Sequence, residues 1–159
     1  MQLFRIARRQ FVSAPFAPFD GEGAYRGGSR WNSPGHRMSF ASLTLSLSML
    51  EYLVHIEWQQ TLGDNLVLVS ARLDAKLVRK LKASELPSNW QRTPRGLETR
   101  RLGDDWLESR SSVALAVPSA VVPIEQNILI NPLHRDFSKL FVQALEPFQF
   151  DTRLMKESV

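Results

Sequence analysis

The segment from Ser42 to Gln59, SLTLSLSMLEYLVHIEWQ, constrains the fold of this chain more than any other stretch. Apolar side chains recur there at helical spacing and fill most of the remaining positions, which predicts an α-helix that is largely buried. A narrow polar stripe of Thr44, Ser48, Glu51 and His55 follows the same spacing. Because a buried carboxylate needs a partner, a raised pKa or a ligand, Glu51 is either an acid satisfied by a nearby Arg or backbone amide, or part of a binding site.

The composition is that of a soluble globular protein. Of the 159 residues, 43% are hydrophobic and 23% are charged, which predicts one domain, residues 1–159, around one sizeable core. There is no cysteine, so disulfides and thiolate metal sites are excluded, in keeping with a reducing cytoplasm. The apolar runs are too short to span a membrane, and the N-terminal sequence lacks the apolar region of a secretory signal. We therefore expect a cytoplasmic protein.

The net charge of +4, from 20 Lys and Arg against 16 Asp and Glu, hints at an anionic partner. The basic residues are spread out, however, and their densest clusters are Arg8-Arg9, Arg79–Lys82 and Arg100-Arg101. Aromatic residues do not alternate with these clusters as they often do on a nucleic-acid-binding face. A solvated surface or a protein partner explains the clusters more simply, and we expect no direct binding of nucleic acid.

The N-terminal region combines a short strand with a long loop. Residues Leu3–Ala7 alternate as a strand does and carry Arg5 between apolar neighbours. Arg5 either points to solvent or, if it points inward, must meet an anion. Residues Ser13–Gly28 are rich in proline and glycine and predict a loop, and loops of this length are often functional.

The sequence GGSRWNSPG, Gly27–Gly35, closes this loop. Its glycine pair lets the backbone approach a ligand closely, and Asn32–Gly35 has the composition of a tight turn. Arg30 could clamp a phosphate and Trp31 could stack on a ring, although packing of this pair is the simpler interpretation. Residues Arg37–Ala41 then predict a strand that leads into the helix described above.

The second half has the character of a scaffold. Asp74 is expected to cap a short helix over 75–81, and Asp104 with Asp105 the N-terminus of another over 103–110 that Trp106 anchors. Further strands are predicted at 65–73, 112–117, 127–130 and 141–151, the last at a sheet edge because it contains a proline. These elements indicate a mixed α+β domain.

No metal site is predicted. His36, His55 and His134 are far apart in the sequence and do not form a ligand motif. His55, beside Glu51 on the polar stripe, is expected to pack or to form a hydrogen bond rather than to act as a base.

Three blocks together resemble the RES domain family: GEGAYRGGSRWNSPG, MLEYLVH and VPSAVVPIEQNILINPLH, which occur in the order and spacing of that family. Its members are toxins of bacterial toxin–antitoxin pairs that act with Xre-type helix-turn-helix antitoxins. The resemblance implies a fold similar to that of ADP-ribosyltransferases. It also implies that NAD is consumed as a substrate, with no cofactor or metal, by cleavage of its nicotinamide–ribose bond.

The resemblance assigns roles to individual positions. Arg5 and Arg30 match family arginines, and Glu51 matches the family glutamate. Ser119 is the best match to the family serine, with Ser111 and Ser112 as close alternatives. The implied catalytic residues are thus Arg30, Glu51 and Ser119.

The remaining matched positions concern binding and packing. Trp31 and Phe40, with Arg5 and Arg30, are implied to contact NAD. Phe40 stands where many members have tyrosine, so stacking on nicotinamide survives but a hydroxyl contact does not. Asn131 and His134 match a block whose role is expected to be structural.

The function implied is a toxin of a type II toxin–antitoxin system that depletes NAD by hydrolysis or phosphorolysis, as a hetero-oligomer with its antitoxin. Two alternatives stay open. The chain could transfer ADP-ribose to a protein, or it could be a non-catalytic interaction module that uses the same groove. The sequence does not identify the acceptor of ADP-ribose.

Overall fold

The computed structural model describes residues 1–12, 17–55, 65–93 and 96–155. Within them, seven strands form one sheet in the order β4-β5-β6-β2-β1-β3-β7, antiparallel except for the parallel pair β4–β5. The strands are β1 (Gln2–Arg8), β2 (Ser39–Ser42), β3 (Leu66–Arg72), β4 (Val78–Lys80), β5 (Ala114–Pro118), β6 (Gln126–Ile130) and β7 (Phe141–Phe148). The helices are α1 (Glu22–Gly27), α2 (Leu45–Leu53) and α3 (Leu97–Ser109).

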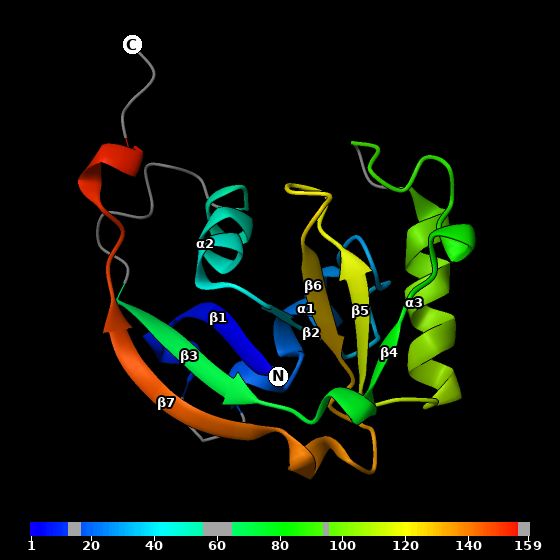
Figure 1. The fold of residues 1–159 in the computed structure, drawn as a ribbon, viewed down its shortest axis with the longest axis horizontal. Coiled ribbons are helices and arrows are strands. Elements are labelled where there is room, and N and C mark those ends of the chain that lie inside the picture. The colour runs from blue at the N-terminus through cyan, green and yellow to red at the C-terminus, as the bar shows by residue number, and fades with distance from the viewer. Residues whose placement is uncertain (13–16, 56–64, 94–95, 156–159) are drawn as a thin grey trace.

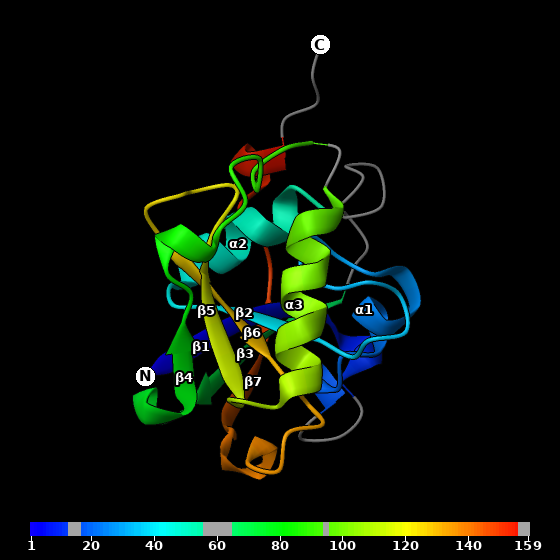
Figure 2. The ribbon, with the colours of Figure 1, turned by 90° about the vertical axis from the view of Figure 1, so that its right-hand side faces the viewer.

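The sheet bends where β1 meets β2. These two strands are joined through the single residue pair Phe4 and Ser42, whereas β1 and β3 pair along their whole length. Figure 1 shows β1, β3 and β7 on one side of the bend, with α2 above β1, and β4, β5 and β6 on the other side. Figure 2 shows α3 lying across the face of β5 and β6.

Residues of β5 alternate between two cores. Leu115 and Val117 pack with Trp106 of α3, while Ala114 and Ala116 pack in the core formed with β1 and β3. Both faces of this central strand are therefore covered, which explains why it is apolar throughout. The α3 helix therefore covers one face of the sheet at β5.

Most strand predictions are confirmed. The strands expected at Leu3–Ala7, 65–73, 127–130 and 141–151 are present with small shifts of their ends, as are those before α2 and at 112–117. The last strand, β7, is an edge strand, as its proline predicted. The tight turn over Asn32–Gly35 is also present, with Gly35 at φ 92°.

The helix α2 is shorter and more exposed than predicted. The Thr44 side chain accepts a hydrogen bond from the Leu47 amide and begins the helix, which ends at Leu53; positions 56–59 of the predicted helix lie outside the described residues. The expectation of a largely buried helix is wrong, because Leu50 and Val54 are 41% and 57% exposed. Only one side of α2 packs on the sheet, since the polar stripe faces an open cavity.

Three local predictions are wrong. The expected loop Ser13–Gly28 contains α1, which is stabilised by the hydrogen bond from the Glu22 amide to Asp20 Oδ1 (2.9 Å); residues 13–16 lie outside the described part. Asp74 does cap, accepting from the Lys76 amide at 2.9 Å, but a short 3₁₀ turn follows instead of a helix. The next residues form β4, which pairs in parallel with β5.

The third wrong prediction concerns the start of α3. This helix begins at Leu97, so Asp104 and Asp105 lie within it rather than at its N-terminus. Trp106 does anchor the helix and is buried. In the described part of the chain, no helix has both the length and the apolar character needed to cross a lipid bilayer.

Candidate active site

A cavity of about 550 Å³ opens between α2, β1, β2 and the turn after β5. Its volume falls in the range of about 300–1,000 Å³ that is usual for sites that bind small molecules. Five residues predicted from the sequence line it: Arg5, Arg30, Trp31, Phe40 and Glu51. Residues far apart in the chain therefore meet around one cavity, as the resemblance implied.

The Glu51 carboxylate is held by neutral donors. Its Oε1 accepts hydrogen bonds from Ser119 Oγ (2.7 Å) and from Asn127 Nδ2. Ser42 Oγ donates to Asn127 Oδ1 at 2.7 Å, which orients the amide so that its NH₂ faces Glu51. Within the described residues, Oε2 accepts no hydrogen bond and no Lys or Arg pairs with Glu51. The carboxylate is thus fixed in place and keeps one oxygen for a ligand.

Ser119 is the only one of the three candidate serines that the structure brings to Glu51. It is buried, and its Oγ accepts from the amides of Val121 (3.0 Å) and Val122 (2.9 Å) while donating to the carboxylate. Ser112, at the opposite end of β5, instead accepts from the indole of Trp106. Ser119 therefore connects the backbone of the turn to the acid.

Arg5 points inward. Its Nη1 donates to Ser39 Oγ and to the Phe40 carbonyl, both at 2.9 Å. Its Nε is a buried donor with no hydrogen-bond partner among the described residues. Burial lowers the pKa of the Arg5 guanidinium to about 10, and the charge of Asp20 opposes this shift only in part. Arg5 therefore remains protonated at neutral pH and presents a desolvated cation to the cavity.

Arg30 stands at the cavity rim and joins two loops. Its Nη1 donates to the carbonyls of Trp90 (2.7 Å) and Arg92 (3.1 Å), in the loop that also places Gln91 and Thr93 on the cavity wall. Trp31, by contrast, is 5% exposed and packs in the core beneath α3. Trp31 also lines the cavity, but because it is almost fully buried in this core, the packing interpretation fits the structure better than stacking on a ligand.

Two further predictions concern His55 and the NPLH block. His55 Nδ1 lies 2.7 Å from the Glu51 carbonyl oxygen, in keeping with the expected hydrogen-bonding role. Asn131 and His134 lie away from the cavity and bond to the carbonyls of Leu107 (3.1 Å) and Arg110 (3.0 Å), so they tie the end of α3 to the segment after β6. This is the structural role expected of the block.

Sequence reasoning missed Asn127 and Ser42. Both are polar side chains on strands that are otherwise largely apolar, and this was the one signal that could have singled them out. Their meeting follows from the register of β2 and β6, in which Ser42 pairs with Asn127. Sequence reasoning also did not predict that Ser48 and Tyr52 line the cavity beside Glu51.

The loop that carries Arg30 depends on Gly28. Its φ of 65° is in the left-handed region, and an added Cβ would lie 2.9 Å from Pro34 Cδ and 3.0 Å from the Asn32 carbonyl oxygen. The buried Asn32 holds the loop from within, donating to the carbonyls of Ala24 (3.0 Å) and His36 (2.8 Å). The loop therefore has a defined shape before any ligand arrives.

Replacing Gly28 with Ala is expected to lower the free energy of unfolding by about 1–3 kcal/mol, because the new residue must adopt a strained φ against backbone atoms. Gly27→Ala is the matched control, since nothing lies within 4 Å of a Cβ there and its φ is ordinary. Urea denaturation of both variants measures the difference. Equal effects at the two glycines would mean that the left-handed conformation is not required.

Comparison with known proteins gives a consistent result over nearly the whole chain. The sequence profile of the RES domain matches residues 2–151. A Yersinia enterocolitica protein named Toxin Res is 38% identical over 156 residues, which cover 97% of this chain and 99% of that toxin. A Sphingobium sp. protein named Prs ADP-ribosylating toxin is 30% identical over 141 residues, 87% of each chain.

The fold is also similar to that of a solved structure. The MbcT toxin, in the crystal structure of the M. tuberculosis MbcT-MbcA toxin–antitoxin complex, superposes with a TM-score of 0.72 over 97% of this chain and 86% of its own. The identity is 15%, so this likeness concerns the fold. It confirms the predicted mixed α+β architecture of the ADP-ribosyltransferase type.

Proposed function

The chain belongs to the RES domain family, and from this premise we propose that it is a toxin that consumes NAD by cleaving the nicotinamide–ribose bond. One observation carries the proposal: Arg5, Arg30 and Glu51 line the same cavity, and neutral donors alone hold the acid. A dinucleotide offers the complementary chemistry, with two phosphate anions at its centre and a cationic nicotinamide ribose at one end.

Binding follows from the two cations. Arg5 lines the cavity with a protonated guanidinium and suits a phosphate oxygen in a desolvated setting, where charge-assisted hydrogen bonds are strong. Arg30 adds positive charge at the rim while its Nη1 remains on the loop carbonyls. Phe40 lines the cavity and supplies an aromatic ring for contact with nicotinamide.

The chemistry requires no redox step. The bond between ribose C1′ and nicotinamide N1 breaks, and its electron pair goes to N1, which becomes neutral nicotinamide. Positive charge develops on the ribose as an oxocarbenium-like state, as in glycoside cleavage. Oε2 of Glu51 can stabilise this charge, while Ser119 and Asn127 keep the carboxylate in place. Water, with loss of a proton to the solvent, or phosphate then adds to the same ribose carbon and gives ADP-ribose or its phosphate ester at that carbon.

A second candidate function has a specific observation in its favour. The Sphingobium relative is named as an ADP-ribosylating toxin, and the same cleavage followed by attack of a protein side chain would transfer ADP-ribose. In both functions Glu51 acts on the same bond, and only the acceptor differs. A non-catalytic module is the alternative from another class.

We further propose that an antitoxin neutralises the chain in a hetero-oligomer, with an Xre-type helix-turn-helix protein as the partner. The structural neighbour MbcT was solved in complex with MbcA as a toxin–antitoxin pair, which supports a partner of this general kind.

The experiment is to incubate the purified chain with NAD and to follow free nicotinamide by chromatography. Release of nicotinamide supports the enzyme, and its absence supports the non-catalytic module. Parallel reactions with and without phosphate, and with a mixture of cell proteins and labelled NAD, separate the three acceptors. Water gives ADP-ribose, phosphate gives its phosphate ester, and transfer labels a protein.

A further inference from the structure

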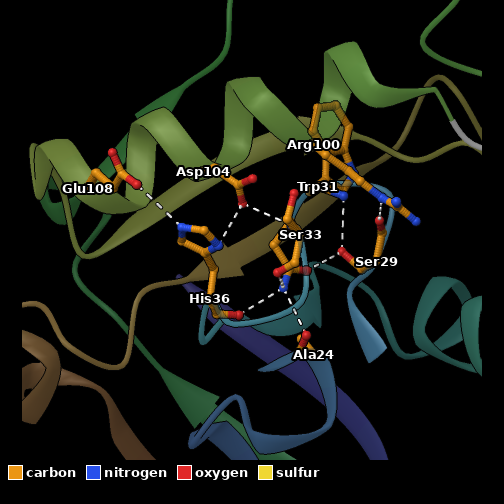
Figure 3. Close-up of polar contacts among 9 residues, drawn as sticks. Ala24, Ser29, Trp31, Ser33, His36, Arg100, Asp104 and Glu108 are labelled. Carbon is orange, nitrogen blue, oxygen red and sulfur yellow. Dashed lines mark hydrogen bonds and ion pairs between the residues drawn. The ribbon is translucent and has the colours of Figure 1, made fainter. Parts of the chain in front are cut away.

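One face of α3 holds the loop that carries Arg30 (Figure 3). Arg100 Nε donates to the Ser29 carbonyl oxygen at 2.9 Å, and Asp104 Oδ1 accepts from the Ser33 amide at 2.9 Å. Positions 100 and 104 are one turn apart and therefore lie on the same side of the helix. They contact the loop on either side of Arg30.

Between these two contacts the helix backbone touches the loop directly. A Cβ on Gly103 would lie only 1.7 Å from the Trp31 carbonyl oxygen, so no side chain fits between helix and loop. Gly103 is buried in the middle of α3, where glycine is otherwise unfavourable for a helix. The close approach explains why glycine occupies this position.

His36, at the far end of the loop, lies against α3. Its imidazole lies between two acids of α3, with Nδ1 3.6 Å from Asp104 Oδ1 and Nε2 3.3 Å from Glu108 Oε1. The helix therefore contacts the loop at residues 29, 31, 33 and 36. Arg30 lies between residues 29 and 31 in the sequence. Its side chain extends to the carbonyls of Trp90 and Arg92.

We propose that α3 positions Arg30 at the cavity rim, and that Asp104 is the principal positioning residue. It touches neither the cavity nor Arg30 itself, and it acts by accepting the hydrogen bond of the Ser33 amide, while the same carboxylate oxygen lies 3.6 Å from His36 Nδ1. The consequence for substrate rests on the proposed function: a displaced guanidinium weakens the binding of an anionic dinucleotide more than it slows bond cleavage. The neighbouring Asp105 is exposed.

The test compares Asp104→Ala, Asp104→Asn and Asp105→Ala by two measurements. Hydrogen exchange reports the Ser33 amide and the loop around it, and steady-state kinetics separates KM for NAD from kcat. Asp104→Ala is expected to speed amide exchange in residues 29–36 and to raise KM about tenfold, equivalent to about 1.4 kcal/mol, with kcat within about twofold. Asp104→Asn keeps an acceptor oxygen and should recover most of both losses.

Asp105→Ala removes the same charge from the adjacent exposed position and should match the wild type in both measurements. Exchange and KM unchanged in Asp104→Ala, or kcat lowered with KM unchanged, would overturn the proposal. If Asp104→Ala does not fold, Arg100→Met tests the contact to Ser29, with the exposed Arg101→Met as its control and the same expected rise in exchange and KM. Hydrogen exchange needs no NAD. It therefore tests whether Asp104 holds the loop even if the wild type releases no nicotinamide and the proposed function fails.

Discussion

Replacing Glu51 with Gln is expected to lower kcat for nicotinamide release by a factor of about 10²–10³, the usual effect of removing one preorganised electrostatic contact to a transition state. Gln keeps the size of the side chain and an oxygen that can accept from Ser119 and Asn127, so the fold should persist. What it loses is the negative charge that opposes the positive charge developing on ribose. KM for NAD should change little, because the ground state gains less from this carboxylate.

Glu125→Gln is the matched control. Glu125 lies in the turn after β5 and accepts a hydrogen bond from Thr44 Oγ1 at 2.8 Å, but it does not line the cavity. The same loss of charge there should leave kcat within about twofold of the wild type. Near-normal turnover in Glu51→Gln, or equal losses in both variants, would remove Glu51 from the catalytic site.

The second large effect is expected at Arg5. A pKa lowered to about 10 means that the folded protein holds this proton less tightly than the unfolded chain does. At neutral pH, burying the charged guanidinium therefore costs stability. Arg5→Met keeps much of the apolar volume without the charge, so the free energy of unfolding should stay within about 1 kcal/mol of the wild type or rise. KM for NAD should increase at least about tenfold, since a charge-assisted hydrogen bond contributes about 1.5–3 kcal/mol.

The control here is Arg72→Met, at the exposed end of β3. It removes one positive charge from the same sheet and should alter neither KM nor stability appreciably. The opposite pattern for Arg5→Met, with marked destabilisation and an unchanged KM, would show that Arg5 serves the fold and not the ligand.

The strands and the three central site residues could be predicted from the sequence because the signals for them are local. Alternation along a strand is visible within a few residues, as toward the end of β3, and the proline in β7 marks an edge strand. Arg5, Arg30 and Glu51 could be identified because charged side chains in apolar or glycine-rich surroundings are conspicuous. That they line one cavity came from the family resemblance, and local patterns alone would not have revealed it.

What could not be predicted depends on tertiary contacts. The first turns of α3, LETRR, are mostly charged and precede a mid-helix glycine, so the local pattern gives no reason to begin a helix at Leu97. Tertiary packing explains the glycine, because Gly103 lies against the Trp31 carbonyl. Likewise, Asn127 reaches Glu51 only through the pairing of β6 with β2.

The central claim is that the cavity beneath α2 is an NAD site in which Glu51 faces the bond that breaks. A crystal structure of the Glu51→Gln chain with NAD bound tests this most directly, because the variant should retain the substrate intact. We predict NAD in the cavity, with its phosphates at Arg5 and C1′ of the nicotinamide ribose beside residue 51. NAD bound elsewhere, or a cavity that stays without ligand at saturating NAD, would contradict the account.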